Sequence, residues 1–217
     1  MVLDGRAWVC KEEIGDVKVK GAGKYDEKVF VDVWRRYGLG HDVEARRPGE
    51  WDIEERRTLV FMRKPEGDEG PAPAARLVKY VHPPTYSASL LPTPTHLFHF
   101  SALTYNAHSI HLDPLYAKSQ DGHRALLVHG PLSLALMLRV LNDHVAPKND
   151  DGKIGGVIKS IVYRNYAPLY VGEKMSVCVR QTKRDAAKGE EEWDVWIEGP
   201  EGGMAVKGSV VVDASLL

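Results

Sequence analysis

The chain has 217 residues, a formal net charge of −1 at pH 7 and a pI of about 6.8. A chain of this length can bury a real core in one large or two small domains, and its near-neutral charge argues against a nucleic-acid partner. No apolar run is long enough to span a bilayer, so no membrane insertion is expected, and the first residues match neither a secretory signal nor an organellar presequence. Cys10 and Cys178 stand far apart in apolar, strand-like segments, which predicts reduced core residues of an intracellular protein.

The front of the chain is predicted to form strands. Alternating or β-branched runs typical of strands occur three times, at Val17–Lys20, Lys28–Trp34 and Arg57–Met62. Residues Pro65–Ala75 combine proline, glycine and acidic side chains and predict a flexible linker. We therefore expect a first domain over residues 1–76, with strands but no long helix, and a second domain over residues 77–217.

The second domain begins with a predicted strand at Thr95–Leu103, after two proline-rich segments that interrupt regular structure. A short helix is predicted at Pro114–Ser119, because Asp113 is a good N-cap and proline is favoured at the first helical position. Pro131 opens a long helix that runs to about His144 and is apolar around most of its circumference, as expected of a buried helix.

The last third of the chain is predicted to consist of antiparallel strands after a turn at Gly152–Gly156. Four strands are expected, at residues 157–163, 174–181, 193–198 and 204–212. Trp193 and Trp196 fall on opposite faces of their strand, which predicts that both cannot be interior. A long apolar helix followed by antiparallel strands indicates an α+β fold in which a sheet wraps around the helix.

Histidine is concentrated in one part of the second domain. Six of the nine histidines lie between residues 96 and 129: His96, His99, His108, His111, His123 and His129. Imidazole titrates near neutral pH, so such a cluster suggests proton transfer or metal binding. The pairs His96/His99 and His108/His111 have ligand-like spacing, but residues three apart in a strand point to opposite faces, and no cysteine or clustered carboxylate completes either pair. No metal is therefore expected.

Two segments of this region carry the most specific signal, FSALTYNAHSIH at Phe100–His111 and LVHGPL at Leu127–Leu132. They resemble the MaoC-like hot-dog dehydratase and hydratase family, and within it the fungal hydroxyacyl-thioester dehydratase type 2 branch of mitochondrial fatty-acid synthesis. The resemblance extends from about Trp8 to Val212 through three supporting segments, RTLVFM at Arg57–Met62, PPTYS at Pro83–Ser87 and NYAPL at Asn165–Leu169.

The resemblance implies a hot-dog fold, an acyl-thioester substrate and no cofactor of the protein's own. The substrate would be carried on coenzyme A or on the phosphopantetheine of an acyl carrier protein, which would then be a partner, and a homodimer is left open. It also implies a mitochondrial location. Without the resemblance, the absence of a visible presequence would favour the cytoplasm. Family members are double hot dogs, whereas this chain begins in the middle of the first one. Its front is therefore expected to be an incomplete N-terminal half, left by a fragment, a truncated gene model or a degenerate half.

The resemblance has one departure in the motif itself. The broader hydratase motif has Asp, Asn and His at the positions of Asn106, His108 and His111, and only His111 is kept here. The pattern Asn-x-His-x-x-His is nevertheless usual for this branch. Because an amide does not titrate near pH 7, more of the proton chemistry is expected to fall on His111.

Dehydration of a 3-hydroxyacyl thioester needs a base at C2, an acid for the departing hydroxyl and a donor for the thioester oxygen. We expect His111 to be the base and Asn106 to hold the hydroxyl in line. Gly130, where a loop becomes the long helix, is expected to donate its backbone N–H to the developing oxyanion. His129 is expected to shape this loop.

The less certain candidates are His108, which could face solvent or support His111, and two arginines. Arg164 and Arg124 could meet the phosphates of coenzyme A or of a phosphopantetheine arm, although surface arginines are commonly just solvated. A plainer interpretation also stays open for the main residues: Asn106 and His111 could form a hydrogen-bonded loop, and Gly130 could serve helix–strand packing.

Three functions compete with the main hypothesis, a (3R)-hydroxyacyl-thioester dehydratase that is reversible as a trans-2-enoyl-thioester hydratase. A mesaconyl-CoA-type hydratase has a similar Asn-x-His-x-x-His segment. An arginine at the end of the acyl tunnel would favour that carboxylate substrate, and an apolar tunnel would favour a fatty acyl chain. A catalytically inactive, truncated hot-dog binding protein is the second competitor. Thioester hydrolysis is disfavoured, because Pro131–Val140 contains no carboxylate.

Overall fold

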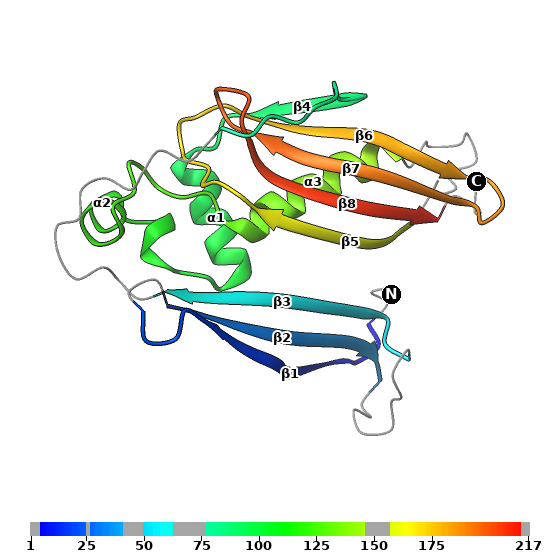
Figure 1. Ribbon diagram of the computed structural model, residues 1–217, viewed down its shortest axis with the longest axis horizontal. Helices are drawn as coiled ribbons and strands as arrows, with labels where there is room; N and C mark the ends of the chain where they lie inside the picture. The colour runs from blue at the N-terminus through cyan, green and yellow to red at the C-terminus, as the bar shows by residue number, and fades with distance from the viewer. Residues whose placement is uncertain (1–4, 25–26, 41–49, 63–76, 146–156, 214–217) are drawn as a thin grey trace. The chain divides into compact units, whose positions relative to one another are not determined.

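The structure is a computed structural model that describes residues 5–24, 27–40, 50–62, 77–145 and 157–213. Contacts divide the chain into two units, Met1–Pro73 and Ala74–Leu217 (Figure 1). The predicted linker Pro65–Ala75 and the predicted turn Gly152–Gly156 both lie outside the described residues. Each unit is therefore considered by itself.

The first unit is an antiparallel sheet of three strands in the order β1-β2-β3, namely β1 (Trp8–Lys20), β2 (Lys28–Leu39) and β3 (Ile53–Met62). The predicted strands lie within these longer ones, and the described residues of the unit contain no helix. Val17 pairs with Val31, which pairs in turn with Leu59. Paired residues share a face of a sheet, so this register gathers apolar side chains on one face of the unit.

Cys10 corrects one prediction made from the sequence. It lies on β1, an edge strand of this open sheet, and is exposed, so it is not a core residue. Cys178 is buried as predicted, on a strand with neighbours on both sides. Burial raises the pKa of the Cys178 thiol to about 12, which leaves this thiol in its unreactive protonated form at neutral pH.

The second unit is a five-stranded antiparallel sheet wrapped around one helix, α3 (Gly130–Val145), as Figure 1 shows. The strand order is β4-β6-β7-β8-β5, with β4 (Tyr86–Leu90), β5 (Val157–Asn165), β6 (Met175–Asp185), β7 (Glu190–Glu198) and β8 (Met204–Asp213). The predicted long helix and the four predicted late strands are confirmed, as is the short helix, α2 (Pro114–Asp121), which Gly122 ends in a left-handed conformation. In the part of the chain that is described, no helix is long and apolar enough to cross a membrane.

The helix α3 is less completely buried than its composition predicted. One stripe is buried, at a spacing of four residues, by Ser133, Met137, Leu141 and Val145. Flanking leucines are half-buried, whereas Ala135 and Arg139 are exposed. The sheet therefore covers one side of α3, and the helix buries a stripe against it as an amphipathic helix does.

The segment Thr95–Leu103 is helical, and the predicted strand there is wrong. It belongs to α1 (Pro94–Thr104), which begins with a capping box in which Thr93 accepts from the His96 N–H and the His96 side chain accepts from the Thr93 N–H. Pro94 occupies the first turn, where a proline lacks only an N–H that would be unpaired anyway. The aromatic and β-branched composition suggested a strand, but the cap and the spacing of the buried residues Leu97 and Ser101 are those of a helix.

Trp193 and Trp196 are both buried, which contradicts the prediction that only one of them could be interior. Trp193 lies in the core against α3, and Trp196 lies on the opposite face of β7. That outer face is covered by Tyr80, whose ring stacks on Trp196 with 4.0 Å between ring centroids. The Tyr80 hydroxyl donates to Asp194 at 2.6 Å, and Lys207 forms a salt bridge to the same carboxylate at 2.9 Å. The segment before β4 therefore acts as a second layer over the sheet.

Replacing Tyr80 with Phe should lower the free energy of unfolding by about 1 to 2 kcal/mol, because Asp194 would lose a hydrogen bond made to its charge. Urea unfolding measures this loss. The matched control is Tyr105→Phe, since the Tyr105 side chain is 97% exposed and should lose nothing. Equal stabilities of Tyr80→Phe and the wild-type chain would show that this outer layer contributes little.

Candidate active site

The predicted site residues begin at the end of α1. Tyr105 has a φ of 53° and ends the helix in a left-handed conformation. The Asn106 N–H then donates to the Ser101 carbonyl at 3.0 Å, a pattern that reverses the chain after a helix. Asn106 is half-buried at this turn, so it follows a helix and not a strand as the sequence suggested.

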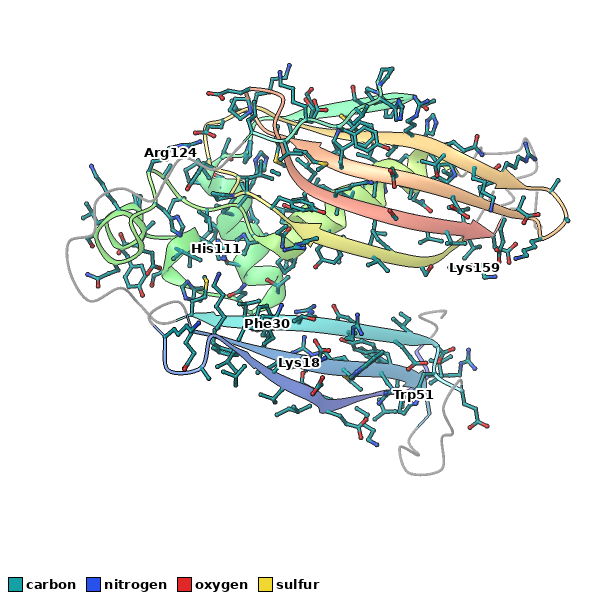
Figure 2. The ribbon with its side chains drawn as sticks, in the orientation of Figure 1. Lys18, Phe30, Trp51, His111, Arg124 and Lys159 are labelled. Atoms are coloured by element: carbon teal, nitrogen blue, oxygen red, sulfur yellow. The ribbon has the colours of Figure 1, made fainter. Side chains whose placement is uncertain are left out.

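A short 3₁₀ turn, η1 (Ser109–His111), comes next and places His111 against the segment before α3. His111 lies with α1 and α2 at one end of the sheet (Figure 2) and is only 8% exposed. Its Nδ1 lies 2.7 Å from the Leu127 carbonyl oxygen. A carbonyl can only accept, so Nδ1 carries the hydrogen and the neutral ring keeps its lone pair on Nε2. This is the form of imidazole that acts as a base.

The pKa of His111 is lowered from its ordinary value, mainly because burial disfavours the charged imidazolium and also because His108 is nearby. The hydrogen bond to Leu127 acts in the opposite direction and is the smaller effect of the two. His111 is therefore neutral at pH 7 and can accept a proton.

His129 is fully buried directly beside His111. The two rings are stacked, with centroids 3.6 Å apart and planes inclined by 22°. Its Nε2 lies 2.9 Å from the Ser101 Oγ, whereas its Nδ1 is buried without a hydrogen-bond partner among the described residues. Burial, with a smaller contribution from His111, lowers the pKa of His129 to about 4. His129 is thus a neutral ring that supports His111.

His108 lies at the rim of this group. Its side chain is exposed and accepts from the Ile110 N–H at 3.4 Å, so it caps η1. The centroids of the His108 and His111 rings are 6.2 Å apart. Of the two interpretations left open by the sequence, this geometry favours a side chain that faces solvent while holding the turn that carries His111.

Gly130 is the first residue of α3, one residue beyond His129. Along the described chain its N–H has no hydrogen-bond partner, and the first bond of the helix runs from the Ser133 N–H to the His129 carbonyl at 3.1 Å. The start of a helix concentrates unpaired N–H groups and partial positive charge. The predicted oxyanion donor is therefore available.

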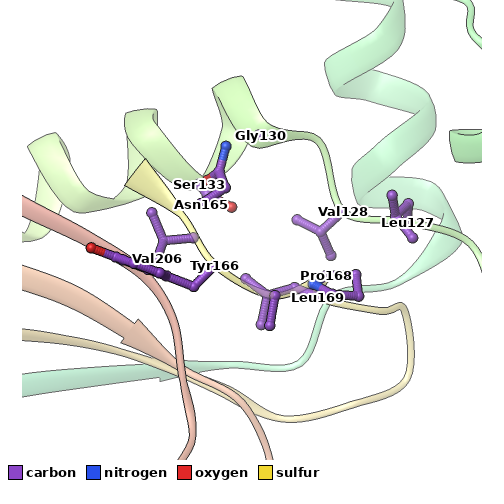
Figure 3. A pocket seen from close by; sticks show the side chains of 10 residues that line it. Leu127, Val128, Gly130, Ser133, Asn165, Tyr166, Pro168, Leu169 and Val206 are labelled. Carbon is purple, nitrogen blue, oxygen red and sulfur yellow. The ribbon is translucent and has the colours of Figure 1, made fainter. Parts of the chain in front are cut away.

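A cavity of about 310 Å³ opens at this helix start (Figure 3). Gly130, Ser133 and Asn165 lie together at one part of its wall. None of its lining residues is charged, and most are apolar: Leu127, Val128, Gly130, Ser133, Asn165, Tyr166, Ala167, Pro168, Leu169 and Val206. Such a cavity fits a largely apolar group with few polar contacts.

The two candidate arginines differ in how free their charges are. Arg124 is held by Glu173 through two hydrogen bonds of 2.7 Å and lies over the Tyr170 ring at 4.2 Å, so its charge is already balanced. Arg164 is exposed and lies over the ring of Tyr166, a cavity residue, at 5.5 Å. Arg164 is therefore the better placed of the two for an anionic group at the cavity.

The histidine pairs with ligand-like spacing have other roles. His96 caps the start of α1, so His96 and His99 lie on a helix and not on the predicted strand. Within the described ranges, no group of three or more His, Cys, Asp or Glu side chains is close enough to hold a metal ion.

Sequence reasoning missed Ser101, Ser133 and Asn165 as members of this site. Ser101 bonds to His129, and the other two line the cavity beside Gly130. Asn165 opens the NYAPL segment and Ser101 lies in the FSALTYNAHSIH segment. Both segments carry the family resemblance, so the sequence contains a signal for these two residues although it does not indicate their roles.

Comparisons with known proteins identify the family. The family model described as hydroxyacyl-thioester dehydratase type 2 matches residues 2–171. The mesaconyl-C(4)-CoA hydratase of Chloroflexus aurantiacus is 32% identical over 158 residues, which cover 73% of this chain and 50% of that protein. The mitochondrial hydroxyacyl-thioester dehydratase type 2 of Schizosaccharomyces pombe is 28% identical over 130 residues, or 60% of this chain and 40% of that protein. A solved MaoC-like dehydratase from Phytophthora capsici has a TM-score of 0.61 at 18% identity and covers 94% of this chain and 64% of its own.

This chain belongs to the hydroxyacyl-thioester dehydratase type 2 family, because the family model matches well over half of it. The resemblance seen in its motifs is thereby confirmed, and the likeness to the solved structure confirms the predicted hot-dog fold class. The chain spans about half the length of the curated relatives it matches.

The buried His129 predicts an acid-sensitive fold. Its pKa is 6.5 in the unfolded chain and about 4 in the folded one, so the unfolded chain binds the proton more tightly. The free energy of unfolding therefore loses nothing to this residue above pH 6.5. As the pH falls towards 4, proton binding to the unfolded chain lowers the free energy of unfolding, by roughly 3 kcal/mol at most.

Urea unfolding at pH 7 and at about pH 4.5 should therefore show a smaller loss of stability for His129→Gln than for the wild-type chain. His99→Gln is the control, because His99 is exposed and its replacement should leave the acid dependence unchanged. An acid dependence of His129→Gln as steep as that of the wild type would mean that His129 is not held neutral by burial.

Proposed function

We propose that this chain is a (3R)-hydroxyacyl-thioester dehydratase, a hydro-lyase that runs in reverse as a trans-2-enoyl-thioester hydratase. The observation that carries the proposal is the hydrogen bond from His111 Nδ1 to the Leu127 carbonyl, which leaves the Nε2 lone pair free to act as a base in a ring that stacks on His129, the residue before α3. Family membership supports this reaction class, since the matching family model and relatives are described as dehydratases or hydratases.

His111 performs both proton transfers in the proposed mechanism. In the dehydration direction, its Nε2 lone pair removes the C2 proton, and the C2–H electrons move towards the thioester oxygen as an enolate. These electrons then return to form the C2–C3 double bond while the C3–O bond breaks. The imidazolium gives its proton to the departing hydroxyl, so water leaves and His111 is neutral again.

Gly130 and Asn106 supply binding in this mechanism and no proton. The unpaired Gly130 N–H stabilises the negative charge that develops on the thioester oxygen, with the partial positive charge of the α3 start adding to it. Asn106, at the turn after α1, holds the hydroxyl or the product water through its amide. His129 keeps the His111 ring in place without competing for the proton, because its pKa of about 4 leaves it neutral.

The lining of the cavity supports a fatty acyl substrate. Neither an arginine nor any other charged residue is among the residues that line it, so a substrate carboxylate placed there would be buried without a partner, which is costly. An alkyl chain meets mostly apolar side chains in the same space. The acyl chain would be carried on coenzyme A or on acyl-carrier-protein phosphopantetheine, and Arg164 is the side chain available for a phosphate of that carrier.

A mesaconyl-CoA-type hydratase is the second candidate. The relative with 32% identity is named as an enzyme of this kind, and its match covers 73% of this chain. The chemistry at His111 and Gly130 would be the same, so acyl preference separates the two candidates. A mitochondrial location is proposed with the first candidate, on the basis of the relative from Schizosaccharomyces pombe.

Loss of the enoyl-thioester absorbance on hydration measures the proposed reaction directly. The wild-type chain should hydrate trans-2-enoyl-CoA substrates, with longer unbranched chains preferred to mesaconyl-CoA. His111→Ala should lower kcat by about 100-fold or more, because general acid and base catalysis are both removed. His99→Ala, at an exposed position of α1, should keep full activity. A folded wild-type chain without turnover would contradict the proposal and leave thioester binding as its role.

The pH profile of the same reaction should report His111. Its neutral form is required in the free enzyme, and burial lowers its pKa from 6.5. The acid limb of kcat/KM should therefore fall below pH 6.5, with full activity above it. An acid limb centred above pH 6.5 would place the essential proton on another group.

A further inference from the structure

The Gly130 N–H at the start of α3 is one donor for a thioester oxygen, while stabilisation of an oxyanion commonly uses two. The second donor must lie near Gly130 and be free of other hydrogen bonds. The cavity wall around Gly130 contains both backbone N–H groups and polar side chains. A group of this wall can serve as the second donor only if it makes no other hydrogen bond.

The backbone donors of the wall are largely occupied. The Leu127 N–H donates to the Ile110 carbonyl at 3.0 Å and the Val128 N–H to the Leu169 carbonyl at 2.8 Å. The N–H groups of Tyr166 and Ala167 both donate to the Ala205 carbonyl, at 2.7 and 3.1 Å. These bonds hold β5 and its following loop beside the start of α3, and they leave those N–H groups unavailable to a ligand.

The polar side chains of the wall are three. The Ser133 hydroxyl donates to the His129 carbonyl at 3.4 Å, and the Tyr166 hydroxyl points away from Gly130 in Figure 3. The Asn165 amide makes no hydrogen bond to the described residues, and its nitrogen lies 3.4 Å from where a side chain at position 130 would begin. The Asn165 amide therefore faces the same space as the backbone of Gly130.

The position of Asn165 follows from the sheet. It is the last residue of β5 and pairs with Val206 on β8, another residue of the cavity wall. The ladder behind it fixes the backbone of Asn165, and with it the point from which the exposed side chain reaches the space beside Gly130. Because Gly130 has no side chain, the amide and the helix start can approach each other closely.

We propose that the Asn165 side-chain amide is the second donor to the thioester oxygen, acting together with the Gly130 N–H. This inference rests on the proposed function, since it assigns a catalytic residue to the same reaction. An amide is suited to this task, because it donates without carrying a charge and does not change its protonation between pH 5 and pH 8. The oxygen would lie between the two donors, with the acyl chain in the uncharged cavity.

The test compares Asn165→Ala and Asn165→Asp in hydration of crotonyl-CoA. Loss of an oxyanion donor should lower kcat by about 100-fold with little change in KM, since the donor acts mainly in the transition state. Asn165→Asp should lose at least as much, because a carboxylate has the shape of the amide but repels an oxyanion. Asn142→Ala, an exposed position on α3, should behave as the wild type. If Asn165→Asp keeps the kcat of the wild-type chain, Asn165 is a packing residue and the inference is overturned.

A second readout keeps this test separate from that of the proposed function. Acetoacetyl-CoA forms an enolate with its own absorbance, and two donors at its thioester oxygen should raise the enolate fraction of the bound ligand. A wild-type chain that hydrates no trans-2-enoyl-CoA of any chain length, but shows an enolate band that Asn165→Asp abolishes, would contradict the proposed function and support Asn165 as a donor. The absence of an enolate band with the wild-type chain, or an equal band with Asn165→Asp, would overturn the inference.

Discussion

The hydrogen bond between His111 Nδ1 and the Leu127 carbonyl is the contact on which the rest of this site depends. It joins η1 to the segment before α3, and the Leu127 N–H returns a bond to the Ile110 carbonyl. The next residue, Val128, bonds to Leu169 beyond the end of β5. One line of hydrogen bonds thus aligns the base, the helix start and the cavity wall, and it sets the tautomer of His111 at the same time.

Desolvation gives the stacked imidazoles different roles. His129 is fully buried, one of its nitrogens has no hydrogen-bond partner among the described residues, and its pKa is about 4. His111 is slightly exposed, and its pKa is also lowered by burial, but the hydrogen bond to the Leu127 carbonyl opposes this shift. A proton taken up here therefore resides on His111, the less buried of the two rings. A second proton on His129 would be strongly repelled, because the centroids of the two rings are only 3.6 Å apart. The arrangement provides one base in an apolar setting, and the cavity at the start of α3 has no charged residue in its lining.

The sequence was sufficient for features that depend on local pattern and insufficient for those that depend on distant segments. The apolar run after Gly130 predicted α3, and the two motifs led to the family and to His111. The capping box of α1 was hidden by two prolines and an aromatic composition, and nothing near Trp196 indicates that Tyr80 covers it. Asn165 stood in a recognised motif, but its role emerges only when the end of β5 is placed beside the start of α3.

The tautomer and charge of His111 can be read from the nitrogen NMR spectrum of the ¹⁵N-histidine-labelled chain, in which the His111 signals are assigned by comparison with His111→Gln. At pH 7 we expect a neutral ring with the hydrogen on Nδ1 and an unprotonated Nε2, which titrates below 6.5, the value of an unperturbed histidine. A ring with its hydrogen on Nε2, or one that is charged at pH 7, would show that His111 is not the base, because its Nε2 would then have no lone pair with which to take the C2 proton.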